Sequence, residues 1–103
     1  MLLSTLHTIP NKDFDILGLV EGSTVQSKHI GKDFGASFKT IVGGELKGYT
    51  EMLEDARKEA TNRLIQQAYS LGADAVLGIH YSSSAVMQGA AEILCYGTAV
   101  KFK

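Results

Sequence analysis

The stretch LGADAVLGI, residues 71–79, decides the fold because the hydrophobic period changes within it. Before it, apolar residues recur every three or four positions, as on one face of a helix, and after it they alternate, as in a strand. A helix is therefore expected from about Tyr49 to Leu71, closed by Gly72, since glycine readily takes the left-handed conformation that ends helices. The apolar stripe of this helix comprises Leu53, Ala56, Ala60, Leu64, Ala68 and Leu71.

Strands are expected on both sides of this helix. The sequence FDILGLVEGSTV, residues 14–25, precedes it, and residues 75–82 and 92–102 alternate after it. The order is β-α-β-β, in which a right-handed crossover makes the first two strands parallel and the last strand returns antiparallel between them. The predicted fold is thus α+β in two layers. In the strand after the helix, the side chains predicted to pack against the helix are Ala75, Leu77, Ile79 and Tyr81.

Three smaller features complete this outline. Residues 2–9 are apolar and β-prone and are followed by the turn sequence PNKD, which predicts an additional N-terminal edge strand. Residues 82–90, SSSAVMQGA, predict a loop. Gly18 and Gly22 lie inside the strand at 14–25, where they predict that another backbone or side chain approaches closely.

Composition limits the classes of function. A chain of 103 residues allows one domain, residues 1–103, and its net charge of −1 gives no electrostatic footprint for nucleic acid or for an anionic membrane. Its single cysteine, Cys95, cannot form an internal disulfide, and the first residues lack the basic and apolar regions of a signal peptide. We therefore expect a cytoplasmic protein with neither nucleic acid nor membrane as a partner.

One helix can cover only one face of such a sheet. The apolar residues predicted on the other face are Ile16, Val20, Val76, Ile93 and Cys95. A large apolar patch is unusual on a soluble monomer, so a neighbouring subunit is expected to cover it. The alternative is cover within the chain, by residues 2–9 and by a short helix within 26–46. The spacing of Phe34, Phe38 and Ile41 predicts that helix, and Gly43-Gly44 is expected to end it.

Several motifs together resemble the YbjQ family of small bacterial and archaeal proteins, whose members are often labelled heavy-metal-binding. The likeness spans nearly the whole chain. It is carried by Asp33, by GG at 43–44 followed by Tyr49, and by AR at 56–57, LGADAV at 71–76 and YGTAV at 96–100. The resemblance implies a dodecin-like β-α-β-β subunit that forms a closed ring, a homopentamer or a decamer of two stacked rings. It brings no established activity and no catalytic residues.

Metal ligands are few and scattered. His7, His29, His80 and Cys95 lie on separate segments, without the paired spacing of a structural zinc site. The strongest candidate pair for a heavy-metal ion is His80 with Cys95, because their strands are neighbours and both side chains are predicted on the face opposite the helix. The more usual roles are a small buried hydrophobe for Cys95 and a rim residue for His80.

No set of residues forms a recognisable catalytic motif, so no catalytic residue is assigned. Residues at the family motifs, Asp33, Tyr49, Arg57 and Glu92, are the candidates for an intersubunit or ligand site, with structural roles as the alternative. The function expected from these observations is non-enzymatic binding of a small molecule by a homo-oligomer. The alternatives are heavy-metal binding in a metal-stress response, and an enzyme whose site lies between subunits.

Overall fold

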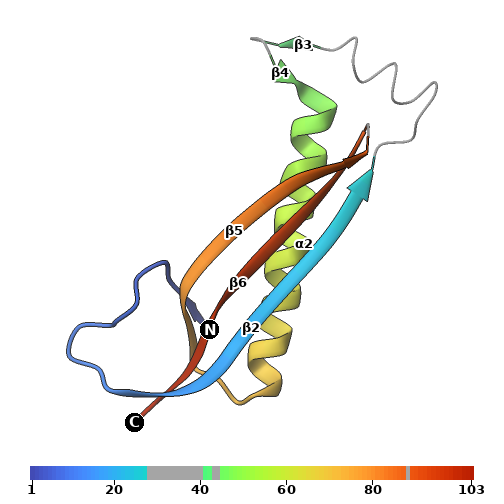
Figure 1. Ribbon diagram of the computed structural model, residues 1–103. Helices are drawn as coiled ribbons and strands as arrows, with labels where there is room; N and C mark the ends of the chain where they lie inside the picture. Colours follow the sequence, from blue (N-terminus) through green and yellow to red (C-terminus); the bar gives the residue numbers. More distant parts are fainter. Residues whose placement is uncertain (28–40, 43–44, 88) are drawn as a thin grey trace.

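The computed structural model describes residues 1–27, 41–42, 45–87 and 89–103. Figure 1 shows a long helix against a twisted sheet. The elements are β1 (Leu2–Leu3), β2 (Phe14–Ser27), β3 (Ile41–Val42), β4 (Glu45–Leu46), α2 (Lys47–Ser70), β5 (Ala75–Met87) and β6 (Ala90–Phe102). No helix in the described part of the chain is long and apolar enough to cross a membrane.

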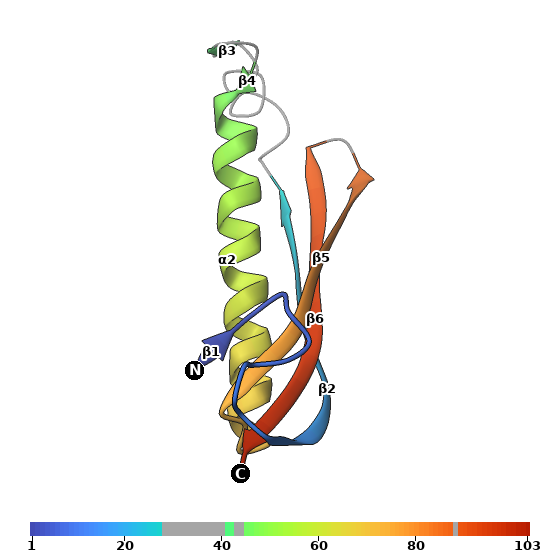
Figure 2. The same ribbon diagram turned by 90° about the vertical axis from the view of Figure 1, so that its left-hand side faces the viewer.

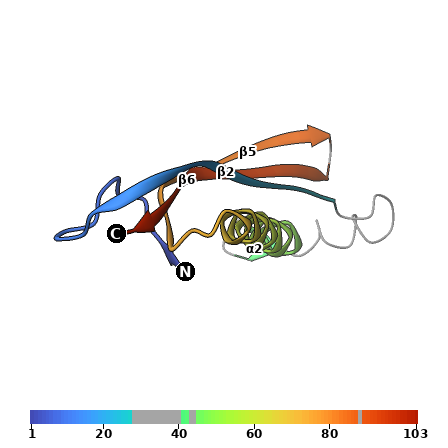
Figure 3. The same cartoon turned by 90° about the horizontal axis from the view of Figure 1, so that it is seen from below.

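The main sheet has the strand order β1-β5-β6-β2. Strand β6 is antiparallel to both β5 and β2, so β2 and β5 run parallel to each other, and β1 adds a parallel edge next to β5. Figure 3 shows the two layers end-on, with α2 below the sheet. The α+β class, the two layers and the central position of the last strand are therefore confirmed.

The end of α2 forms as the sequence predicts. The N–H of Gly72 donates to the carbonyl of Tyr69 at 3.0 Å, and the N–H of Ala73 donates to that of Ala68 at 3.1 Å. These two bonds define a Schellman motif, which requires a left-handed residue at its centre. Gly72 supplies it with φ 79°.

Close approach is confirmed at one of the two glycines in β2. A Cβ on Gly22 would overlap the carbonyl oxygen of Ala60 and the backbone of Leu64, so α2 lies directly on this strand. Gly18 has no neighbour of this kind; it has φ 141° and follows a register shift between Ile16 and Gly18. Its role is to permit a β-bulge.

The prediction of which sheet face packs against the helix is wrong for much of the sheet. The helix-facing core contains Val20, Val76, Ile93 and Cys95, all predicted on the opposite face. Ile16 alone of that set lies away from the helix, and its side chain is 71% exposed. The sequence pattern predicts the alternation within each strand. Because both faces of these strands are apolar, the pattern does not predict which face meets the helix.

A bulge in β5 explains why the predicted helix-facing side is wrong in the first part of that strand and right in the second. The register shifts between Leu77 and His80, and Gly78 has φ 63°. Ala75 and Leu77, before the bulge, point away from the helix, while Ile79 and Tyr81, after it, lie on the helix side as predicted. One extra residue exchanges the two faces.

The predicted loop at 82–90 is also wrong. Strand β5 continues to Met87 and pairs with β6 in a long hairpin, with Ser83 opposite Ile93. Serine is a weak strand former, so the sequence predicts a loop; pairing with the apolar strand β6 overrides that local preference.

The short helix predicted within 26–46 lies mostly outside the described residues. Where it is described, the prediction is wrong: Ile41–Val42 is a strand paired with Glu45–Leu46, and α2 begins directly afterwards at Lys47. Ile41 and Val42 are β-branched, which favours a strand over a helix end.

A second core covers the lower part of the face opposite the helix. Its buried residues are Ala75, Leu77 and Val100, against which Ile9, Phe14 and Phe102 pack. At this end, the N-terminal segment of the same chain folds back over the sheet and buries its face. Nearer the hairpin, the exposed apolar residues on this face include Leu19, Val25 and Tyr96.

Candidate functional site

A groove of about 660 Å³ lies between α2 and β5. Its floor and walls carry charged and polar side chains, namely Glu54, Arg57, Lys58, Thr61, Asn62 and Tyr81. The groove exists because α2 packs against β2 and β6 and barely touches β5. Figure 2 shows the far end of β5 diverging from the helix. The volume falls within the usual range of roughly 300–1,000 Å³ for small-molecule sites.

The helix presents its groove residues on one face. Each of positions 54, 57, 58, 61 and 62 has another of the set three or four residues away, which places their side chains in adjacent turns on the same side. Tyr81 reaches the groove from the sheet because the bulge at Gly78 turns it toward the helix. Sequence periodicity and one backbone irregularity together assemble the site.

Hydrogen bonds fix the two hydroxyl groups of the groove. The Thr61 hydroxyl donates to the carbonyl of Arg57 at 2.7 Å and lies 2.8 Å from the Tyr81 hydroxyl. Because the Thr61 proton is used on the backbone, Tyr81 donates to Thr61, and each hydroxyl oxygen keeps a free lone pair. The groove thus offers oriented oxygen acceptors beside the charged side chains of Arg57 and Lys58.

The charges of the groove favour binding an anion. Arg57 and Lys58 contribute two positive charges and Glu54 one negative charge, so the groove carries a net charge of +1 from these three side chains. An exposed guanidinium can bind a carboxylate or phosphate through two parallel hydrogen bonds, and the ammonium adds a third donor. None of the groove residues is a cysteine, serine or histidine, so the lining offers no nucleophile paired with a histidine base.

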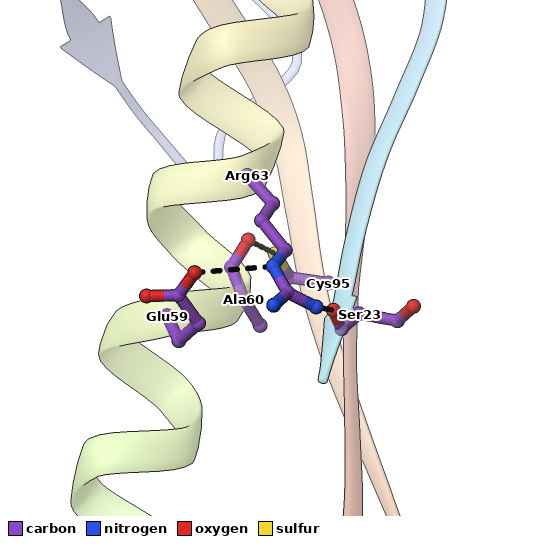
Figure 4. Close-up of polar contacts among 5 residues, drawn as sticks. All are labelled: Ser23, Glu59, Ala60, Arg63 and Cys95. Atoms are coloured by element: carbon purple, nitrogen blue, oxygen red, sulfur yellow. Dashed lines mark hydrogen bonds and ion pairs between the residues drawn. The ribbon is translucent and has the colours of Figure 1, made fainter. Parts of the chain in front are cut away.

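Cys95 lies in a different place, in the core between β6 and α2. Its side chain is fully buried, and the thiol donates to the carbonyl of Ala60 at 3.3 Å (Figure 4). Burial raises the pKa of the Cys95 thiol above its ordinary value of 9.0, and a backbone hydrogen bond with Gly22 lowers that pKa by less. The prediction that Cys95 is buried in the last strand is confirmed.

His80 lies on the other side of the sheet from Cys95. Its ring stacks on that of Tyr96, with centroids 5.6 Å apart, and its Nδ1 lies 2.8 Å from the carbonyl of Gly78. The register places Tyr81, not His80, opposite Cys95, and adjacent side chains point to opposite faces. The expectation that His80 and Cys95 share a face is therefore wrong. Among the described residues, no group of three or more His, Cys, Asp or Glu side chains could hold a metal ion.

The remaining candidate residues that the structure describes are not brought together. Arg57 lines the groove. Tyr49 is half-buried near the start of α2, and Glu92 is half-buried on β6, paired with Ser84 on the face away from the helix. Asp33, like His29, lies outside the described residues.

Sequence reasoning missed Thr61, Asn62 and Lys58 as partners of Arg57. A signal was present in the sequence, because Thr61 follows Arg57 by four residues and Asn62 follows Lys58 by four, which places two adjacent rows on the polar side of the helix. The participation of Tyr81 follows from its predicted helix-facing position, once the continuation of β5 is known.

Two other hollows are less suited to ligand binding. One, of about 890 Å³, is lined by Phe14 of β2, by Lys103 and by residues of the segment before β2, so most of its wall belongs to a segment without helix or strand. The other, of about 170 Å³, lies under His7 between Phe14 and Leu77 and is too small for most metabolites.

Comparisons with known proteins agree with this fold. A crystal structure of a protein of unknown function of the DUF74 family, from Pediococcus pentosaceus, superposes with a TM-score of 0.72 over 100% of this chain and 98% of that one, at 19% identity. At this identity the likeness concerns the fold alone.

Relatives are much closer in sequence. The chain is 56% identical over 101 residues to a UPF0145 protein of Clostridium novyi, covering 98% of each chain. It is 57% identical over 104 residues to a UPF0145 protein of Thermotoga petrophila, covering 100% of this chain and 98% of the relative. The model of a family described as "Putative heavy-metal-binding" matches residues 1–103. The chain therefore belongs to the YbjQ family.

Proposed function

We propose that the protein is a non-enzymatic, self-assembling protein that binds a small anionic molecule in the groove between α2 and β5. The observation that carries this proposal is that Arg57 and Lys58 line one groove of about 660 Å³, in which the free lone pairs of Thr61 and Tyr81 can accept hydrogen bonds from hydroxyl or amino groups of the same ligand. Ligand sites combine a shaped cavity with a few oriented polar groups, and this groove has both features.

The shape of the monomer supports self-assembly. Its radius of gyration is 17.0 Å, whereas a compact domain of about 100 residues has a value of roughly 13 Å. Several exposed apolar residues, including Leu19, Val25, Val86 and Met87, lie on strands β2 and β5. A closed ring of five copies, or two such rings stacked, is the assembly that we propose for these surfaces.

Binding is tested on the wild-type protein by native mass spectrometry against a library of carboxylates and phosphorylated metabolites, followed by calorimetry on the best ligand. We expect Arg57→Gln to weaken binding at least tenfold, because a bidentate charged contact is lost. Lys103→Gln removes one positive charge outside the groove and serves as the matched control. Equal affinity of Arg57→Gln and wild type, or the absence of any binding anion, would contradict the proposal.

Heavy-metal binding is the second candidate, and it has the family description in its favour. The described residues of one copy do not form a metal cluster, so such a site would need side chains from two copies or from outside the described segments. Elemental analysis of the purified assembly tests it directly: a stoichiometric metal that survives dialysis supports this candidate over anion binding.

A further inference from the structure

Charged donors and neutral acceptors occupy successive turns of α2 in the groove between α2 and β5. Arg57 and Lys58 carry the positive charges, and the oxygen pair formed by the hydroxyls of Thr61 and Tyr81 lies one turn further along the helix. From Arg57 to Thr61 the helix advances by four residues, or about 6 Å along its axis. The groove therefore offers two separate binding positions to one ligand.

The oxygen pair can only accept hydrogen bonds from a ligand. The Thr61 hydroxyl uses its proton on the carbonyl of Arg57 at 2.7 Å, and the Tyr81 hydroxyl uses its proton on Thr61 at 2.8 Å. Each oxygen then presents a lone pair to the groove. An anionic group placed there would face these lone pairs without a proton between them, so this position selects a hydrogen-bond donor on the ligand.

A neutral hydroxyl fits the oxygen pair better than a charged amino group does. Arg57 and Lys58 lie one turn away and would repel a second cation. The carboxylate among the described lining residues, that of Glu54, precedes these cations by one turn, on the side away from the oxygen pair. Asn62 also lines the groove, and its amide can donate to the oxygen of the same ligand hydroxyl. A hydroxyl, which both donates and accepts, thus matches the groups at this position.

The charges at the other position favour a phosphate monoester over a carboxylate. A phosphate monoester carries roughly −1.5 to −2 charges at neutral pH and has three acceptor oxygens, whereas a carboxylate has a single charge and fewer oxygens. The guanidinium of Arg57 can bind two of the phosphate oxygens while the ammonium of Lys58 binds the third. The carboxylate of Glu54 on the same groove disfavours a ligand with a second acidic group.

From these observations we infer that the ligand of the groove is a phosphate monoester of a small polyol or sugar. Its phosphate binds Arg57 and Lys58, and one of its hydroxyls donates to the oxygen pair of Thr61 and Tyr81. The inference rests on the proposed function, because it names the class of anion that the groove binds. It requires no particular assembly, since one copy supplies every described lining residue.

A matched pair of ligands tests this assignment by calorimetry on the wild-type protein. Glycerol 1-phosphate and propyl phosphate share the phosphate and the carbon chain, and only the first carries hydroxyl groups. We expect glycerol 1-phosphate to bind about fivefold more tightly, which is the typical value of one neutral hydrogen bond. Glycerate, which has hydroxyls but a carboxylate in place of the phosphate, should bind more weakly than glycerol 1-phosphate.

Variants locate the source of the preference for hydroxyls. The double variant Thr61→Val and Tyr81→Phe keeps the shapes of both side chains and removes both acceptor oxygens, so the ratio of the two affinities should fall to about one. Tyr81→Phe alone should give an intermediate ratio. Tyr69→Phe removes the hydroxyl of an exposed tyrosine on the same helix outside the groove, and as the matched control it should keep the wild-type ratio. Circular dichroism checks that each variant is folded.

The outcomes separate this inference from the proposed function. Equal affinities for glycerol 1-phosphate and propyl phosphate, or a preference that survives in the double variant, overturn the inference and leave anion binding in the groove standing. Tighter binding of glycerate than of glycerol 1-phosphate also overturns it, in favour of a hydroxy acid. If neither phosphate binds, the inference is wrong, and the carboxylates of the library alone decide the proposed function. Wild-type affinity of Arg57→Gln for both phosphates overturns the inference together with the proposed function.

Discussion

The covered half of the sheet and its open half are built from similar strands but differ in every contact that surrounds them. Strand β2 has α2 on one face, β6 along one edge, and Gln67 and Arg63 along the other. The second half of β5, from His80 to Met87, has β6 along one edge and is exposed elsewhere. The off-centre position of one helix thus divides the sheet into a half that stabilises the fold and a half available for binding.

The close contact between α2 and β2 in the covered half gives the largest expected effect on the free energy of unfolding. Gly22→Ala places a methyl group where the backbone of α2 lies, so the helix must move away from β2, and we expect a loss of about 3 kcal/mol in the free energy of unfolding. Ser83→Ala, in the open half, should change it by less than about 0.5 kcal/mol. Chemical denaturation of both variants measures the difference, and similar values for the two would refute the division.

The connection between α2 and the start of β5 is expected to be less sensitive to substitution. Gly72→Val forces a β-branched residue into the left-handed conformation at the end of α2, at a cost of about 2 kcal/mol. No atom lies near the added Cβ, so the cost is conformational and not steric. Gly72→Asn should recover much of it, since asparagine tolerates this conformation. Thermal and chemical unfolding distinguish the two variants, and equal losses for both would show that packing matters here instead.

The side chains of Arg63 and Gln67 cap the outer edge of β2, and their removal should leave that edge free to pair with another chain. The double variant Arg63→Met and Gln67→Leu leaves Glu21 and Ser23 without their side-chain partners, with an expected loss of about 1 kcal/mol because water can replace them. In this background, Ser23→Cys should begin to form covalent dimers or larger species under mild oxidation. Continued absence of cross-linking would mean that something other than these two side chains protects β2.

The smallest effect concerns the protonation of Cys95 in the covered core. Because burial raises the pKa of the folded thiol, the folded chain keeps a proton that the unfolded chain releases. The stability from this group is therefore complete below the ordinary pKa of 9.0 and is lost as the pH rises above it. The gap between wild type and Cys95→Ala in the free energy of unfolding should narrow from pH 8 to pH 10. A gap independent of pH would contradict the buried, protonated thiol.

The local pattern in the sequence was sufficient for the elements whose periodicity is clean. The stripe through Ala56, Ala60, Leu64 and Ala68 is buried as predicted, and Gly72 ends the helix as predicted. Alternation located β2 and β6 within a few residues. The candidate site was only partly predictable: Arg57 lies in the groove, but the pairing of His80 with Cys95 depended on a face assignment that the register reverses.

The sequence by itself determined the α+β class, the element order, the central last strand and the burial of Cys95, because helix and strand periods and glycine conformations are local properties of the chain. Only the tertiary structure decided which face of the sheet meets α2, since both faces are apolar and the bulges after Ile16 and at Gly78 exchange them. It also decided that the serine-rich segment is a strand, because pairing with β6 outweighs the weak propensity of serine. The lateral position of α2, set by its close contact with Gly22, is what opens the groove beside Tyr81 and leaves the edge of β5 free.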